Sequence, residues 1–73
     1  MERKQFIETI LNETVSTAFK YIDHIEYCER NEDYFGFETV TIVCNNGYKY
    51  HVNIEMNSLG AIIEDVVKEA LRH

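Results

Sequence analysis

The sequence predicts an α+β fold with two layers, in which two helices pack on one face of a three-stranded antiparallel meander in the order α-β-β-β-α. Apolar residues recur every three or four positions near both ends of the chain, and they alternate with polar residues between those segments. An Asn46-Gly47 pair, which is typical of tight hairpin turns, divides the alternating part. The length of 73 residues predicts a single domain over residues 1–73.

The first helix is expected over residues 2–21. Several β-branched residues weaken the local helix preference there, so the prediction depends on the spacing of the apolar stripe. The stripe consists of Phe6, Ile7, Ile10, Leu11, Thr14, Val15, Ala18 and Phe19.

A strand is expected over residues 23–30, with Ile25 and Tyr27 on one face and His24, Glu26 and Cys28 on the other. The polar residues 31–33 suit a turn into a second strand over residues 34–45. Gly36, near the start of that strand, marks an expected bulge or bend.

The Asn46-Gly47 pair predicts a two-residue type I′ turn, which fixes the register of the hairpin around it. Counting outward places a set of mostly apolar pairs on the core face: Val43 with Tyr50, Thr41 with Val52, Thr39 with Ile54 and Phe37 with Met56. The opposite face then carries Val40, Ile42 and Cys44 beside Lys49, His51 and Asn53. A shift of one residue would exchange the two faces.

The second helix is expected over residues 59–72, with Asn57 or Ser58 as its N-terminal cap. Lys68 and Arg72 near its end interact favourably with the helix dipole. The apolar stripe consists of Leu59, Ile62, Ile63, Val66, Val67, Ala70 and Leu71.

The composition excludes several classes of function. With 13 acidic against 7 basic residues the net charge is -6, which disfavours unaided binding to a phosphate backbone. No apolar run approaches the ~20 residues that a membrane-spanning helix needs. Two cysteines without a secretory signal predict a cytoplasmic protein with reduced thiols.

No cofactor, metal or catalytic activity is expected. Cys28, Cys44, His24 and His51 are the residue types of a zinc site, but structural zinc ligands come in close pairs. His24 and Cys28 on one strand would lie about 13 Å apart, too far to share an ion. The chain lacks a Gly-rich phosphate loop, a nucleophile elbow and a His-Glu-x-x-His motif, so we expect no enzyme.

With both helices on one side, the other sheet face is expected to lie open. An exposed strip of Val and Ile in a small domain is typical of contact surfaces. One alternative is therefore a homodimer joined through this face, with Val40, Ile42 and His51 at its centre. Cross-strand stabilisation by β-branched residues explains the same pattern without a partner.

The acidic residues provide the leading functional hypothesis. An acidic cluster is expected around one end of the sheet with its first turn, formed by Glu26, Glu29, Glu32, Asp33, Glu38 and Glu55. Of these, Glu29, Glu32, Asp33 and Glu38 are expected to form the acidic contact. Tyr34 and Phe35 beside them are expected aromatic anchors, since aromatic residues are typical of interface hot spots. Such a surface could imitate a nucleic-acid backbone and bind a basic nucleic-acid-binding protein.

In size, acidity and α/β layout, the whole chain resembles the small phage proteins that inhibit host defence, notably the anti-CRISPR proteins. The resemblance implies a non-enzymatic inhibitor that acts in the host cytoplasm by binding a protein. The element order is also that of double-stranded-RNA-binding domains. That resemblance is topological only, because the second helix carries Glu64, Asp65 and Glu69 and no basic cluster at its start. The second alternative function is therefore an RNA-binding domain of this type whose basic surface is lost or altered.

Overall fold

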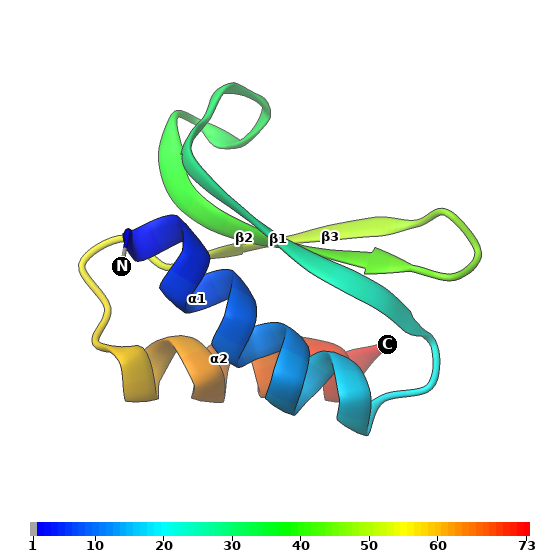
Figure 1. The fold of residues 1–73 in the computed structure, drawn as a ribbon. Helices are drawn as coiled ribbons and strands as arrows, with labels where there is room; N and C mark the ends of the chain where they lie inside the picture. Colours follow the sequence, from blue (N-terminus) through cyan, green and yellow to red (C-terminus); the bar gives the residue numbers. More distant parts are fainter. Residues whose placement is uncertain (1) are drawn as a thin grey trace.

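The computed structural model describes residues 2–73 and confirms the predicted α+β fold. The strands form one antiparallel sheet in the order β1-β2-β3, and Figure 1 shows both helices against the same face of it. The helices and strands are α1 (Arg3–Leu11), β1 (Ile22–Asn31), β2 (Phe37–Cys44), β3 (Lys49–Asn53) and α2 (Leu59–Arg72).

The first helix changes geometry where α1 ends. It continues as a π-helical turn, Asn12–Ser16, and the last helical residue is Ala18, three residues earlier than predicted. The Thr14 hydroxyl donates a hydrogen bond to the Ile10 carbonyl at 2.6 Å, and Thr17 donates to the Glu13 carbonyl at 2.7 Å. Such side-chain bonds compete with the α-helical ladder and accompany its wider turn.

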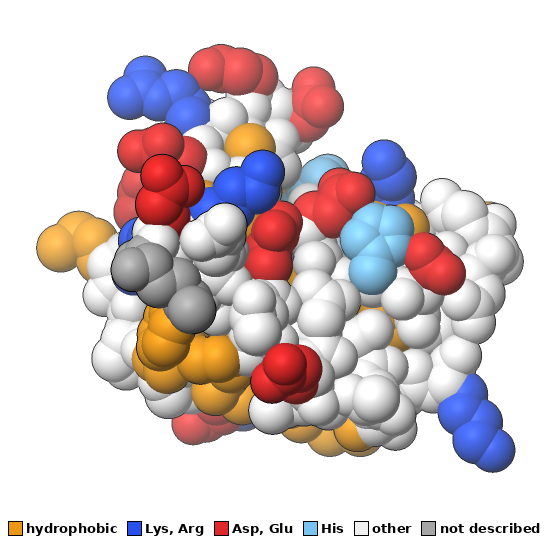
Figure 2. All heavy atoms as spheres, viewed as in Figure 1, with side chains coloured by type: hydrophobic (Ala, Val, Ile, Leu, Met, Phe, Trp, Pro, Cys, Tyr) orange, Lys and Arg blue, Asp and Glu red, His pale blue; other side chains and the backbone are white. Residues whose placement is uncertain are grey.

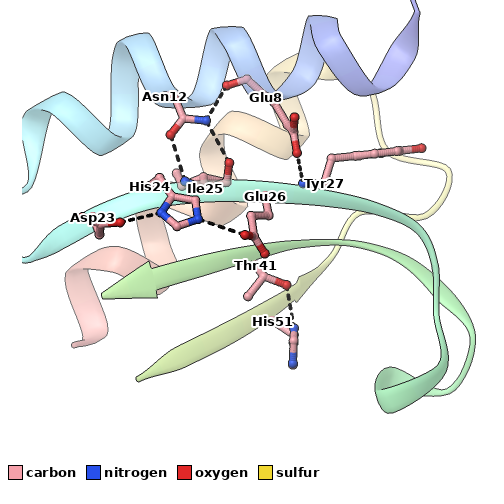
Figure 3. Close-up of polar contacts among 9 residues, drawn as sticks. All are labelled: Glu8, Asn12, Asp23, His24, Ile25, Glu26, Tyr27, Thr41 and His51. Carbon is pink, nitrogen blue, oxygen red and sulfur yellow. Dashed lines mark hydrogen bonds and ion pairs between the residues drawn. The ribbon is translucent and has the colours of Figure 1, made fainter. Parts of the chain in front are cut away.

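Two side chains of the first helix cover the outer edge of β1 (Figure 3). The Asn12 side chain donates to the Ile25 carbonyl and accepts from the Ile25 amide, both at 2.8 Å. The Glu8 carboxylate accepts from the Tyr27 amide at 2.7 Å. An exposed strand edge offers unpaired backbone groups to other chains, so these bonds close this part of the edge.

The hairpin between β2 and β3 has a three-residue loop, and the predicted two-residue turn is wrong. The Gly47 amide donates to the Cys44 carbonyl at 3.0 Å, and the Cys44 amide donates to the Tyr48 carbonyl at 2.8 Å. Gly47 has φ +92°, whereas Asn46 stays at negative φ, so the loop is a type I turn followed by a left-handed glycine. Val40 therefore pairs with Val52 and Ile42 with Tyr50.

The one-residue shift exchanges the faces of β2 only. Val40 and Ile42, predicted on the open face, are 0% exposed, and Cys44 is also buried in the core. Thr39, Thr41 and Val43 occupy the face without helices, while the predicted orientations within β1 and β3 hold. The residues buried in the core are Ile7, Leu11, Val15, Ile22, Ile25, Val40, Ile42, Cys44, Val52, Ile54, Ile62, Val66 and Ala70.

Some apolar side chains lie outside this core. Phe37 and Met56, predicted as a core pair, are both exposed, so that prediction is wrong. Phe6 on α1 and Leu71 on α2 are exposed as well, and Figure 2 shows apolar side chains gathered over the first turns of the helices. Ser58 caps α2 as predicted, with its hydroxyl accepting from the Ala61 amide at 3.3 Å.

Candidate functional site

A pocket of about 330 Å³ lies where the first turn of α1, the adjacent ends of β1 and β2, and the turn after β3 meet. Figure 2 shows acidic and basic side chains side by side at the upper left, over the β1–β2 hairpin drawn there in Figure 1. The residues that line the pocket are Arg3, Tyr27, Glu29, Arg30, Gly36, Glu38 and Glu55. Its volume lies in the range of ligand pockets, but its lining is mostly charged.

A bulge in β1 brings two of these charges to the pocket. Cys28 pairs with Thr39 and Asn31 pairs with Phe37, so β1 spans one residue more than β2 over this stretch. Glu29 and Arg30 lie within the irregular segment. Bulges bend a strand and redirect its side chains, which explains how adjacent residues can both line one pocket.

Glu38 is held by two partners from other parts of the chain. The Arg3 guanidinium donates to it through Nε at 2.6 Å and through Nη2 at 3.0 Å, and the Tyr27 hydroxyl donates to the same carboxylate. These hydrogen bonds, from Arg3 first and Tyr27 next, hold the pKa of Glu38 below its usual value. Burial, together with the bond to Glu38, raises the pKa of Tyr27 to about 12.

Glu38, predicted as part of the acidic contact, is therefore not an open carboxylate. Its side chain is 14% exposed, and its charge is already paired with Arg3. Glu29 and Glu55 are exposed and form no ion pair within residues 2–73. The open carboxylates at the pocket are thus Glu29, a predicted contact residue, and Glu55, which was predicted to lie in the same acidic cluster but not as a contact residue.

Phe35, which precedes the pocket residue Gly36 in the chain, is a bulky side chain in a strained backbone conformation. It is 85% exposed and has φ +60°. The Gly36 amide donates to the Asn31 carbonyl at 2.8 Å, which makes Phe35 the left-handed residue that ends the 3-10 turn Glu32–Tyr34. Glycine is the usual residue at this position, since a side chain there costs about 1–2 kcal/mol.

Met56, in the turn after β3, shows the same combination. It is 97% exposed, has φ +61°, and follows the pocket residue Glu55. The Asn57 amide donates to the Ile54 carbonyl at 3.1 Å, so Met56 is the third residue of a turn, where glycine or asparagine is preferred. Phe35 and Met56 are the only non-glycine residues with positive φ in the described chain.

The remaining residues of the predicted acidic contact lie on the same hairpin. Glu32 and Asp33 are exposed in the 3-10 turn, and the Asp33 amide donates to the Asn31 side chain at 3.0 Å. Tyr34, predicted as an anchor, is half-buried and packs against His51, with 5.8 Å between ring centroids. It supports the hairpin tip, whereas Phe35 projects from it.

The predicted dimer face is absent because Val40 and Ile42 lie in the core. His51 does lie on the open face, where its Nδ1 is 2.8 Å from the Thr41 hydroxyl (Figure 3). The same Nδ1 lies 3.3 Å from the Asn31 amide nitrogen. The amide nitrogen can only donate, so Nδ1 accepts and the imidazole proton resides on Nε2. The centre of this face is consequently polar.

His24 is the other histidine of the open face. Its Nδ1 lies 2.6 Å from the Asp23 carboxylate and its Nε2 2.9 Å from the Glu26 carboxylate (Figure 3). Hydrogen bonds to Glu26 and then Asp23 raise the pKa of His24. Within residues 2–73, no group of three His, Cys, Asp or Glu side chains is arranged to hold a metal ion.

The two cysteines are free and lie at different ends of β1–β2, Cys28 opposite Thr39 and Cys44 opposite Ile22. Neither described helix, α1 nor α2, combines the length and the apolar content needed to cross a membrane.

Compared with models of protein families, with curated proteins and with solved structures, the chain matches none. Its function is therefore inferred from the geometry. The sequence prediction missed Arg3, Arg30 and Met56 as residues of the site. Met56 carries a usable signal, because an apolar residue in a short polar turn suggests either burial or a contact.

Proposed function

We propose that this chain is a non-enzymatic protein-binding module, and that its docking site is the charged pocket together with Phe35 and Met56, the chain neighbours of the pocket residues Gly36 and Glu55. The observation that supports the proposal is the pairing of exposure with strain at these two residues. In water, neither side chain gains the burial that would offset a left-handed backbone. Insertion into a partner provides that burial.

The carboxylates beside Phe35 and in the pocket favour a basic partner. Glu32 and Asp33 lie beside Phe35, and Glu29 and Glu55 line the pocket without an ion pair of their own in the described chain. With the net charge of -6, these carboxylates accelerate encounter with a basic surface. Aromatic and methionine side chains then serve as buried anchors, as is typical of interface centres.

The class of partner that best fits this chemistry is a basic nucleic-acid-binding protein. Such a protein binds phosphates through Lys and Arg side chains on its surface. An acidic site with apolar anchors can therefore compete with the nucleic acid for that surface. The chain would then act as an inhibitor of that protein, which is also the role implied by its resemblance to phage-encoded inhibitors of host defence.

Site-specific photocrosslinking in host lysate tests the docking site. A photoreactive amino acid is placed at Phe35 or Met56, and matched probes are placed at Phe6 and Leu71, which are exposed on the helices. We expect one common partner to crosslink from Phe35 and Met56 and not from the helix positions. High salt should reduce the yield, because exposed charges are screened.

Two further outcomes decide the proposal. Glu32→Lys combined with Asp33→Lys should abolish the crosslink from Phe35 if the acidic residues steer the partner. Crosslinks that arise only from Phe6 or Leu71, or that persist unchanged in the double lysine variant and in high salt, would reject this site or its preference for a basic partner.

A further inference from the structure

The outer edge of β3 has backbone groups that no strand within residues 2–73 pairs. At the two ends of the β2–β3 ladder, the Cys44 amide donates to Tyr48 and the Ile54 amide donates to Glu38. Hydrogen-bonded pairs alternate along an antiparallel ladder. Of the five residues between Tyr48 and Ile54, every second one is therefore unpaired with β2. These are Lys49, His51 and Asn53, whose N–H and C=O groups point away from β2.

The two edges of the sheet differ in this respect. On β1, the side chain of Asn12 occupies both backbone groups of Ile25, and Glu8 occupies the amide of Tyr27 (Figure 3). No helix side chain makes such a bond to β3 within residues 2–73. A strand from another molecule can therefore add to β3, whereas much of β1 is closed to addition.

We propose that β3 pairs antiparallel with β3 of a second copy of this chain, with the two-fold axis at His51. Each copy contributes its three strands to one continuous sheet. In this register, His51 faces His51 of the second copy, and Lys49 faces Asn53 of the second copy, so no lysine or carboxylate meets a like charge. Each directly opposed outward pair exchanges two backbone hydrogen bonds.

The helix side of the same edge is compatible with this pairing. Tyr50 would face Val52 of the second copy, an aromatic and β-branched pair of the kind that stabilises neighbouring strands. On α2, the Glu69 carboxylate is paired with the Arg72 guanidinium at 3.5 Å, which offsets its charge.

The closure of β1 also favours a two-fold pair over a filament. A head-to-tail contact of β3 with β1 of another copy would repeat without end, and Asn12 and Glu8 obstruct it. Pairing of β3 with itself closes after two copies. It also adds buried surface to a domain whose small size limits its core.

Sedimentation equilibrium combined with amide hydrogen exchange tests the inference. At micromolar concentrations we expect a mass twice that of the 8.6 kDa monomer. Exchange at the His51 amide should slow as the concentration rises, because this N–H is bonded only in the dimer. Exchange at Ile25, whose amide is bonded within the monomer, should not depend on concentration.

Lys49→Pro is the matched variant, with Lys49→Ala as its control. Proline at the first residue of an edge strand removes only an outward N–H, so the fold is kept and dimerisation should weaken at least about ten-fold. Lys49→Ala retains the N–H and should dimerise. If Lys49→Pro does not fold, the concentration dependence of amide exchange at His51 in the natural sequence still tests the pairing of β3.

Three results would overturn the inference. One is a monomer at every concentration with unchanged exchange at His51. Another is a dimer in which His51 exchanges as in the monomer, which would place the contact elsewhere. The third is protection of His51 only when a different protein is added, which would assign the edge to a strand of that protein.

Discussion

Replacing Met56 with asparagine should stabilise the protein, although it removes an apolar side chain. Met56 has φ +61° at the third position of the turn that starts at Ile54, and asparagine adopts this conformation with little strain. The strain on a methionine there is about 1–2 kcal/mol. At 97% exposure, Met56 contributes almost no burial that the substitution could remove.

The expected gain in the free energy of unfolding is about 1 kcal/mol, the lower end of the range for relieved strain. Urea denaturation measures it directly. With a slope of about 1 kcal/mol/M for a small domain, the midpoint should rise by about 1 M. The melting temperature should rise by about 4–8 °C.

Leu71→Asn provides the matched control. Leu71 is 70% exposed on α2 at an ordinary helical φ, so its replacement relieves no strain and lowers helix propensity by about 0.5 kcal/mol. The two variants should therefore shift the midpoint in opposite directions. A loss of stability in Met56→Asn, or equal shifts in both variants, would refute the reasoning from backbone strain.

Three other predictions test the register of the sheet, the closed edge of β1 and the ion pair of the pocket residue Glu38. Ile42→Ala should lower the free energy of unfolding by about 2–5 kcal/mol and Val43→Ala by about 1 kcal/mol or less, because only Ile42 is fully buried. If urea titrations show the larger loss in Val43→Ala, they would support the register of a two-residue turn instead. Asn12→Ala should cost about 1–2 kcal/mol and accelerate amide exchange at Ile25, and unchanged exchange would show that the edge of β1 is not closed by this side chain. Glu38→Gln should cost about 1–2 kcal/mol at pH 7. The folded pKa of Glu38 lies below its usual 4.5, so the contribution of its charge to stability is complete above that value and is lost as the pH falls through the folded pKa. The urea curves of the unsubstituted protein and of Glu38→Gln should therefore converge in acid. A constant difference down to low pH would contradict the ion pair.

The order of the elements could be predicted because each has a local signature. The apolar spacing of residues 59–72 and the cap at Ser58 both indicate a helix, and the structure contains it as α2. The orientation of β1 was also predictable, since Ile25 and Tyr27 alternate with polar residues. These features depend on neighbouring residues alone.

The faces of β2 depended on a turn that the sequence permits in two forms. Asn46-Gly47 can form a two-residue loop, and Asn45-Asn46-Gly47 can form a three-residue loop, so the choice shifts the register by one. The composition of β2 favours the second form, because it places Val40 and Ile42 in the apolar core under the helices and puts Thr39 and Thr41 on the other face. Weighing burial against turn preference would have identified the observed register.

The pocket could be predicted only in part. Glu29 and Phe35 lie near one turn in the sequence, so their proximity follows from the hairpin. Arg3 is 35 positions from Glu38, and their ion pair depends on how α1 crosses the sheet. The positive φ of Met56 follows from the turn that leads into α2, and its residue type gives no local indication of that conformation.

The docking site is tested most directly by measuring affinity and stability together in Phe35→Asn combined with Met56→Asn. Titration of the partner identified by crosslinking should show at least about a 100-fold loss of affinity, as for two hot-spot side chains. Urea denaturation of the same variant should show a free energy of unfolding equal to or above that of the natural sequence, because strain is relieved at both positions. Unchanged affinity in a folded variant would contradict the docking site.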